Sequence, residues 1–322
     1  MSQPEPHYVL PDVQSHLRSH LPLPPKRNDF TKKRILLHLS LFLVTCVTTS
    51  VAGLVLPRIL FENVDISIMG LVAFVLNHFF DPRGWIFAGT LLAILGMHEL
   101  GHYFACRYYR VRATMPYFIP FLPVIGIGTL GAFIKIKEPI RSRRALFDIG
   151  VSGPIVGFVV AVPAAVIGLL MARPEAGVPP LAFNDPLLFV GIKWLFGLPR
   201  HLEWNPIWFA AWVGMVATSL NLLPVGQLDG GHMTYALFGR RPHKMIGIAV
   251  FTSMIAVAVS GWFLHHWAGG ALYAVLLTVM LFAKHPPTAD PFEKIGTLRS
   301  VLALVGLLVF VLSLIPFPIS IP

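Results

Sequence analysis

Charged residues are scarce in this sequence. They make up 12% of the 322 residues, whereas 55% are hydrophobic and the mean hydropathy is +0.71. A soluble domain does not need so much apolar material to fill its core, so the composition excludes an ordinary soluble protein and indicates an integral membrane protein. Only two cysteines, Cys46 and Cys106, are present. They do not suggest a disulfide scaffold or a cysteine metal site.

Seven apolar stretches are long enough, or nearly so, to cross the roughly 30 Å of hydrocarbon in a bilayer. They are residues 35–56, 85–106, 149–171, 206–223, 245–263, 268–283 and 301–315. Two further apolar stretches, 68–80 and 181–198, are too short or too interrupted by charge, so they predict re-entrant or interfacial elements. The predicted fold class is an all-α polytopic membrane protein of about seven transmembrane helices, with a small membrane-associated β element.

The distribution of the 25 Lys and Arg residues predicts how these stretches are oriented. All 25 lie outside the seven stretches, 20 on one side and five on the other. The richer side comprises segments 1–34, 107–148, 236–244 and 284–300. Because basic loops collect on the cytoplasmic side, the N-terminus is expected there. The net charge of +10 therefore reflects topology, and no nucleic-acid partner is expected, because no aromatic platform is interleaved with the basic residues.

Two domains are expected. Residues 1–34 contain six prolines and few apolar runs, which is typical of a flexible cytoplasmic tail. No cleavable signal peptide is apparent in this segment. Residues 35–317 form the second domain, which is the membrane domain.

The residue pattern changes within 124–138. β-Branched side chains alternate in part, and glycines recur at Gly126, Gly128 and Gly131, which is typical of a strand or a hairpin. Such glycines allow another backbone to approach closely. An interfacial loop without strands fits the same residues equally well, so the pattern favours neither structure.

His98, Glu99 and His102 form the pattern His-Glu-x-x-His inside the second apolar stretch. Residues four apart share one face of a helix, so both imidazoles can reach one tetrahedral metal ion. Glu99 directly follows the first histidine and can act as general base on water at that metal. The structural alternative is a satisfied polar cluster between helices, but ionisable groups inside a membrane are more often functional.

A catalytic zinc ion usually has three protein ligands, so a third ligand is expected. Thirteen of the 15 acidic residues lie in the tail or in loops, which leaves Glu99 and Asp229. Asp229 follows Pro224, which should break the fourth span near the cytoplasmic face, where a broken helix can line a polar cavity. We favour Asp229 as the third ligand. His232 is the competing ligand, and Asp229 has two alternative roles, as a helix cap or as a hydrogen-bond acceptor for a ligating imidazole.

The two motifs together resemble the site-2 protease family of intramembrane metalloproteases. His-Glu-x-x-His in one span is followed in a later span by Asn-x-x-Pro and Asp-Gly, here Asn221, Pro224 and Asp229-Gly230. The resemblance covers residues 85–235. It includes the small residues that open the intervening span, which are Gly150, Gly153, Pro154 and Gly157. One departure is the segment Pro-Val-Gly-Gln-Leu-Asp, where many members have a second Pro before the Asp.

The resemblance implies a three-span catalytic core with Zn²⁺ bound by His98, His102 and Asp229. It also implies that Glu99 is the general base. Asn221 matches the family's Asn, which is thought to help position the substrate or to stabilise the oxyanion. No loop contains a PDZ-like insertion, which is typical of a compact member.

The resemblance extends to a β element that contacts substrate. The matching residues are Gly128, Thr129, Leu130 and Gly131. In this family such an element could pair with an unwound substrate strand, and strand addition supplies the main-chain hydrogen bonds that a helical substrate gives up.

The expected activity is hydrolysis of a peptide bond in or near a transmembrane segment of a membrane-protein substrate. The substrate would enter laterally from the lipid bilayer, and water would enter through a polar cleft on the cytoplasmic side. A bacterial inner membrane and an organelle membrane both fit the sequence, which specifies no oligomeric state. One rival is a prenyl-protein type membrane metalloprotease, which takes its third ligand from a later glutamate, but no acid other than Asp229 is suitably placed. The other rival is a non-catalytic zinc-binding membrane protein or transporter.

Overall fold

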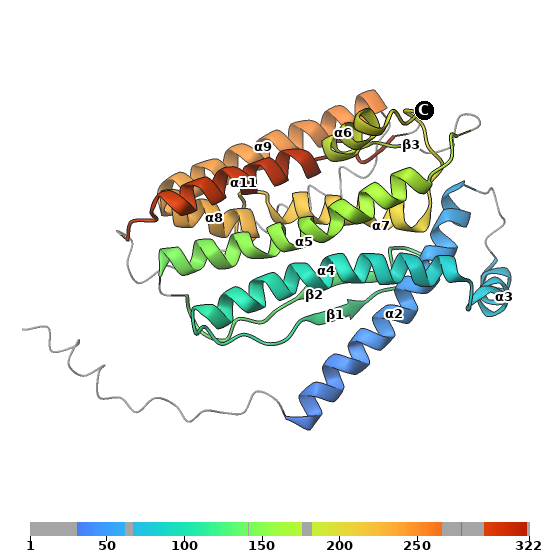
Figure 1. The fold of residues 1–322 in the computed structure, drawn as a ribbon, viewed down its shortest axis with the longest axis horizontal. Coiled ribbons are helices and arrows are strands. Elements are labelled where there is room, and N and C mark those ends of the chain that lie inside the picture. The colour runs from blue at the N-terminus through green and yellow to red at the C-terminus, as the bar shows by residue number, and fades with distance from the viewer. Residues whose placement is uncertain are drawn as a thin grey trace, which may run out of the picture.

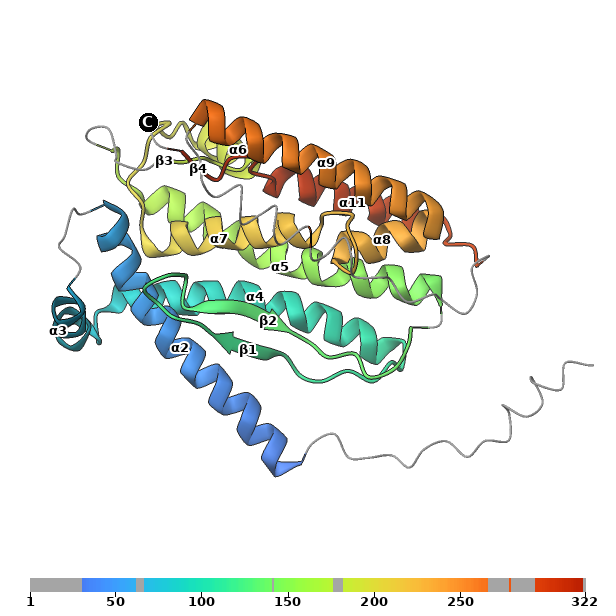
Figure 2. The same ribbon diagram turned by 180° about the vertical axis from the view of Figure 1, so that it is seen from behind.

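Long apolar helices make up most of the computed structural model, which describes residues 31–61, 67–140, 142–175, 182–265, 278 and 293–320. Figures 1 and 2 show most of the helices running side by side, with α2 crossing the bundle obliquely. The helices are α2 (Lys32–Phe61), α3 (Ile68–His78), α4 (Pro82–Tyr108), α5 (Arg143–Met171), α6 (Leu187–Phe196), α7 (Pro206–Asn221), α8 (Asp229–Phe238), α9 (Arg240–His265) and α11 (Thr297–Ser313). The strands are β1 (Tyr117–Pro120), β2 (Thr129–Phe133), β3 (Ala182–Phe183) and β4 (Ile319–Ser320).

Four helices in the described part of the chain, α2, α4, α5 and α9, are long and apolar enough to cross a membrane. The helices α7 and α11 are apolar but have only 16 and 17 residues. The predicted span 268–283 lies outside the described residues apart from Thr278. The mainly helical architecture with a small sheet is therefore confirmed, and the number of seven spans stays a prediction.

Two helix ends differ from the limits that hydropathy predicts. The span predicted at 149–171 begins earlier, at Arg143, because the Ser142 side chain accepts a hydrogen bond from the amide of Ala145. The span predicted at 206–223 ends at Asn221, and the turns that follow contain Pro224. A proline cannot continue the hydrogen-bond ladder of a helix, so the predicted break after the fourth span is present.

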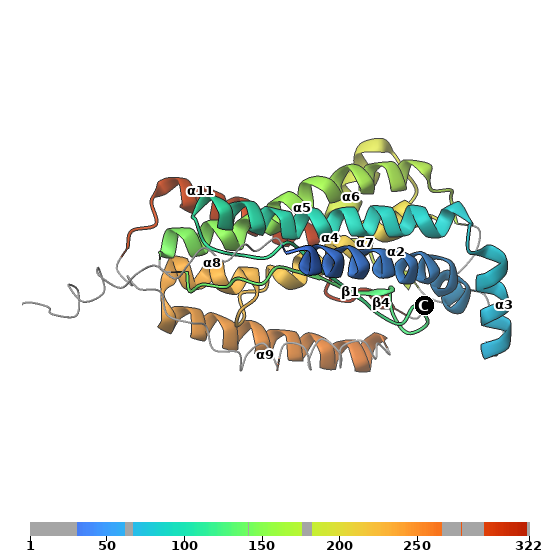
Figure 3. The same ribbon diagram turned by 90° about the horizontal axis from the view of Figure 1, so that it is seen from below.

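Helix α4 lies in the middle of the bundle and packs against α2, α5 and α7. Its residues Phe87, Leu91 and Ile94 are almost completely buried. They belong to a cluster of apolar side chains from α5, α6 and α7. Seen from below, α9 lies at one edge of the bundle (Figure 3). The helix that carries the His-Glu-x-x-His pattern is thus held on several sides.

A salt-bridge cluster joins one end of α4 to α5 and α11. Arg299 donates two hydrogen bonds to Asp148, at 2.9 and 2.7 Å, and a third to the Tyr109 hydroxyl at 2.9 Å. Tyr109 in turn donates to Asp148. Burial, followed by the hydrogen bond to Asp148, raises the pKa of the Tyr109 phenol. This cluster fixes the end of α4 that follows the histidines.

The segment 124–138 contains the strand β2, which pairs with β1 in an antiparallel hairpin. Tyr117 lies opposite Phe133 and Phe118 opposite Ala132. The strand alternative for this segment is therefore correct. The partner strand β1 lies upstream of the pattern, in a segment where the sequence predicts no strand.

The hairpin is attached to α2 at a glycine. Gly128 has φ +80°, and a Cβ atom there would lie 2.3 Å from the carbonyl oxygen of Thr48. The Thr48 hydroxyl donates a 2.6 Å hydrogen bond to the carbonyl oxygen of Gly128. Only glycine combines this backbone conformation with so close an approach. The hairpin loop therefore docks directly on α2.

The two stretches predicted to be re-entrant or interfacial form short helices. Residues 68–80 contain α3, which has 11 residues, and residues 181–198 contain α6, which has 10. At about 1.5 Å per residue, neither helix is long enough to cross a bilayer. Their position relative to a membrane stays a prediction.

We predict that Gly84→Ala separates α2 from α4, because a Cβ atom at this position would lie 2.5 Å from the carbonyl oxygen of Ser50. The expected destabilisation is about 1–3 kcal/mol, the usual cost of an overpacked contact, measured by thermal unfolding of the full chain in detergent. Gly89→Ala in the same helix is the matched control, since its Cβ atom would meet nothing within 4 Å. Equal melting temperatures for the two variants would show that the contact contributes nothing.

Candidate metal centre

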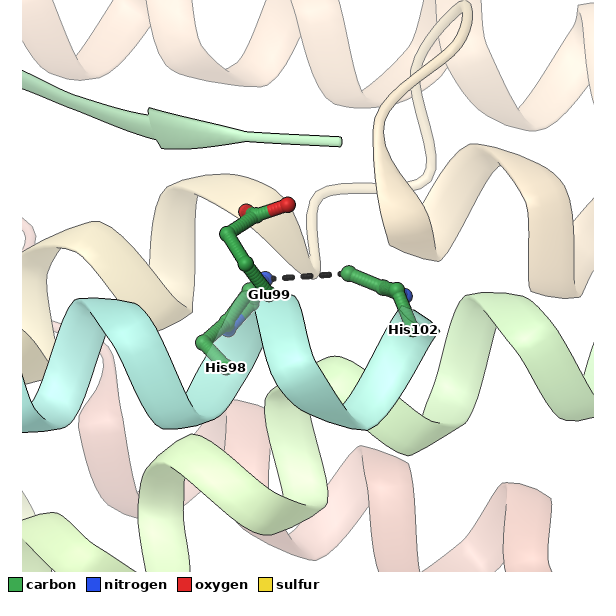
Figure 4. A group of neighbouring side chains, drawn as sticks. All are labelled: His98, Glu99 and His102. Carbon is green, nitrogen blue, oxygen red and sulfur yellow. Dashed lines mark hydrogen bonds between the residues drawn. The ribbon is translucent and has the colours of Figure 1, made fainter. Parts of the chain in front are cut away.

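His98 and His102 present their rings on one side of α4, one turn apart. Their Nε2 atoms are 3.1 Å apart, and the two residues are 5% and 7% exposed. Figure 4 shows the two rings approaching each other while the Glu99 side chain points away from the helix, and a dashed line marks the approach of the two nitrogens. The helical spacing expected from the sequence therefore brings the two imidazoles to one point.

Asp229 reaches the same point from the first residue of α8. Its Oδ2 atom lies 3.1 Å from Nε2 of His98, and its Oδ1 atom lies 3.3 Å from Nε2 of His102. A tight chain reversal places it there, since a Cβ atom on the next residue, Gly230, would lie 1.9 Å from the carbonyl oxygen of Leu222. The position of the Asp229 side chain thus depends on the absence of a side chain at Gly230.

The spacing of these atoms fits one tetrahedral zinc ion. Ligands bound at about 2.0–2.1 Å in tetrahedral geometry are separated by about 3.3 Å. The Nδ1 atom of His102 lies 2.6 Å from the carbonyl oxygen of Ile149, so this nitrogen donates and the lone pair of Nε2 faces the cluster. Two imidazoles and a carboxylate are a common ligand set for catalytic zinc.

The glycine face of α5, defined as Gly150, Gly153 and Gly157, packs directly against His98 and His102 of α4 and against the start of α8. A Cβ atom on Gly153 would lie 2.2 Å from Nε2 of His102, and one on Gly157 would lie 3.0 Å from Cβ of His98. A Cβ atom on Gly150 would lie 3.0 Å from Cβ of His232 and 3.2 Å from the carbonyl oxygen of Asp229. The competing ligand His232 thus packs against α5, and the small residues expected to open this span form a cradle.

Glu99 faces the hairpin. Its side chain is buried, and Oε2 accepts a 2.9 Å hydrogen bond from the backbone amide of Ile134, which directly follows β2. Glu99 can offer an oxygen within 4.8 Å of both imidazoles, but the carboxylate of Asp229 is closer to them. Sequence reasoning missed Ile134, because a backbone amide carries no side-chain signal.

A cavity of about 270 Å³ adjoins the cluster. Its lining includes His98 and Glu99 from α4, Leu130 and Gly131 from β2, and Asn221 from α7. The amide nitrogen of Asn221 lies 3.4 Å from Nε2 of His98. Asn221 and two of the four residues expected to contact substrate therefore meet at one cavity.

The other two residues of the expected β element have different surroundings. Gly128 docks on α2, as described above. Thr129 is only 3% exposed, and its hydroxyl donates a 2.9 Å hydrogen bond to the carbonyl oxygen of Ile119. Both residues stabilise the hairpin in the structure, whereas Leu130 and Gly131 face the cavity.

The sequence from 86 to 261 matches the model of peptidase family M50. The chain belongs to this family. The match confirms the resemblance to site-2 proteases that the two motifs carry. Helices α5, α7 and α8 and the hairpin lie within the matched residues, as does α4 from Ile86 onward.

Several curated proteins are similar to this M50 chain. "Probable zinc metalloprotease EGY1, chloroplastic" of Arabidopsis thaliana is 29% identical over 241 residues, which cover 70% of this chain and 42% of that protein. "Probable zinc metalloprotease EGY2, chloroplastic" of Oryza sativa subsp. indica is 31% identical over 158 residues, which cover 46% of this chain and 28% of that protein. The chain thus spans less than half the length of these relatives, and their names agree with the expected zinc cofactor.

One solved structure is similar at low identity. "Site-2 Protease from Methanocaldococcus jannaschii" aligns with 70% of this chain and 91% of its own, at 16% sequence identity and a TM-score of 0.34.

We predict that Gly153→Ala impairs metal binding, because the added methyl group would occupy the space of the His102 ring. Altered support of a ligating histidine typically lowers metal affinity about 10–100-fold, so bound zinc should fall to about a tenth at limiting metal. The measurement is zinc per chain by elemental mass spectrometry. Val159→Ala, an exposed position on the same helix, should keep full zinc. An unchanged zinc content in Gly153→Ala would contradict the claim that this glycine makes room for the His102 ring.

Proposed function

We propose that this chain is an intramembrane zinc endopeptidase that cleaves peptide bonds in or near transmembrane segments of membrane proteins. The observation that carries this proposal is the meeting of His98, His102 and Asp229 within 3.3 Å of one another inside the helical bundle. Membership of peptidase family M50 supports the same reaction class. Zinc bound by these three residues would polarise the peptide carbonyl and acidify the attacking water.

Glu99 is proposed as the general base. Its Oε2 atom accepts the hydrogen bond from Ile134, which leaves Oε1 available within the described structure. Oε1 would take a proton from the attacking water and then deliver it to the nitrogen of the leaving amine. The Ile134 amide orients the carboxylate during both transfers, so Glu99 needs no rearrangement between them.

The substrate is proposed to bind along β2. Leu130 and Gly131 line the cavity together with Glu99, so an extended peptide added beside this strand would pass the cluster. Asn221 lies at the same cavity, where its side-chain amide can donate to the carbonyl oxygen of the bond being cleaved. The substrate must therefore be unwound locally before it reacts.

The membrane arrangement is part of the proposal. Seven spans, a cytoplasmic N-terminus and a site open toward the cytoplasm follow from the apolar stretches and the basic loops. Residues 1–34 act as a tail, residues 35–317 form the membrane domain, and residues 85–235 hold its catalytic core. The chloroplast relatives are compatible with an organelle membrane for this chain.

We predict that Asp229→Ala removes zinc while the helices persist. Loss of one of three protein ligands leaves the metal with only two imidazoles, so zinc content should fall at least about tenfold. Elemental mass spectrometry measures the metal, and circular dichroism of the same sample monitors the fold. Glu203→Ala is a control at an exposed loop position outside the cluster, and zinc loss in both variants would contradict the assignment of Asp229.

We predict that Glu99→Gln retains zinc but loses cleavage. A glutamine is nearly isosteric and still accepts from Ile134, but it cannot take a proton, so the rate should fall about 10²–10⁴-fold. The assay uses the full chain in proteoliposomes with single-span membrane proteins that co-purify with the inactive variant. Glu138→Gln, an exposed glutamate paired with Arg112, is the matched control.

A Glu99→Gln variant that binds zinc normally and still cleaves at the full rate would exclude Glu99 as the base. If the wild-type chain binds zinc but cleaves none of the trapped proteins, the endopeptidase proposal fails, and the non-catalytic zinc-binding alternative takes its place.

A further inference from the structure

A groove of about 540 Å³ separates α2, α4 and β1. The two helices touch where Gly84 of α4 packs on the backbone of Ser50. From that crossing α2 diverges from α4 toward its own N-terminal end, and the hairpin lies in the opening (Figures 1 and 2). The groove is the part of this opening that the hairpin leaves unfilled.

The walls of the groove are mainly apolar. The side chains that form them include Ile35, Leu39 and Phe42 of α2, Leu100 of α4 and Phe118 of β1. The three residues of α2 are 51%, 51% and 37% exposed, so the groove is open along this helix. Because α2 is apolar and long enough to cross a membrane, this opening faces lipid if α2 spans the bilayer.

One end of the groove is basic. Arg34 lies in the first turn of α2, Arg107 lies in the last turn of α4, and Lys137 follows β2, and all three line the groove. None of the described residues that line it is acidic. Within the described part of the chain, Arg107 makes no ion pair. The side chains that line the groove thus include three cations and no acid among the described residues.

We propose that this groove binds one anionic phospholipid. The phosphate group lies among Arg34, Arg107 and Lys137, and an acyl chain lies along the apolar wall beside Leu39 and Phe42. The basic end and the apolar wall match the two parts of such a lipid, and basic pockets between transmembrane helices are known to favour anionic headgroups. A zwitterionic lipid fits less well, because its ammonium group would meet the same cations.

The bound lipid would contact the hairpin at β1, whereas β2 lines the cavity beside the metal centre. Tyr117 and Phe118 of β1 line the groove and pair with Phe133 and Ala132 of β2. The residue after β2, Ile134, hydrogen-bonds Glu99. Lipid in the groove therefore stabilises the strand that orients Glu99. Binding itself does not depend on the proposed catalysis, so the two proposals can fail separately.

The test is native mass spectrometry of the full chain released from nanodiscs that contain equal amounts of dioleoylphosphatidylcholine and dioleoylphosphatidylglycerol. We expect one phosphatidylglycerol per chain to survive detergent exchange and no phosphatidylcholine. In the double variant Arg107→Gln/Lys137→Gln, retention should fall about twentyfold to thirtyfold, since each basic residue near an anionic lipid contributes a factor of about five.

The matched control is Arg110→Gln/Lys135→Gln, which removes the same charge from neighbouring positions that do not line the groove. It should retain phosphatidylglycerol as the wild type does. Leu39→Trp fills the apolar wall at an exposed position without changing charge, and it should also lose the lipid. Loss in the control equal to that in the groove variant would overturn the proposal, because general surface charge would then explain the retention.

Hydrogen exchange gives a readout that needs no activity. Phosphatidylglycerol nanodiscs should slow exchange in peptides that span residues 129–134, relative to phosphatidylcholine nanodiscs, in the wild type and not in Leu39→Trp. Equal retention of the two lipids, or full displacement by glycerol 3-phosphate or by a soluble polyglutamate peptide, would overturn the assignment of an anionic lipid.

Discussion

Helix α5 approaches the turn of α4 that carries His98 and His102 so closely that no side chain fits at Gly153. The arrangement of the whole centre depends on this contact. It brings the carbonyl oxygen of Ile149 to the Nδ1 atom of His102, which orients the ring, and it brings Gly150 against α8, which carries Asp229. Larger residues on this face of α5 would push α4 and α8 apart, and the three polar side chains would no longer meet.

The β1–β2 hairpin is the second feature on which the arrangement of the site depends. Its loop docks on α2 through Gly128, its strand β2 leads to the amide that binds Glu99, and its strand β1 lines the groove between α2 and α4. One small sheet thus contacts the first long helix, the proposed base and the proposed lipid. Because Glu99 is oriented by a backbone amide, any change in hairpin position acts directly on that carboxylate.

Much of the site could be predicted because its side chains carry strong local signals. The helical spacing of His98 and His102 predicted that their rings meet. The position of Asp229 as the one acid between Glu203 and Asp290 favoured it over His232 as the third member of the cluster. Other features depend on long-range contacts, such as the pairing of β1 with β2 and the hydrogen bond from Ile134 to Glu99. The lengths of α5 and α7 also differ from the apolar stretches, because capping at Ser142 and the turns around Pro224 set the ends.

The central claim is that His98, His102 and Asp229 bind one zinc ion. Zinc K-edge X-ray absorption of the full chain tests it most directly. The expected spectrum shows two imidazole nitrogens at about 2.0–2.1 Å and a carboxylate oxygen at about 2.0–2.2 Å, and the zinc absorption per chain falls at least about tenfold when Asp229 is replaced by Ala. Sulfur ligands at about 2.3 Å, or a spectrum unchanged by that substitution, would contradict the assignment.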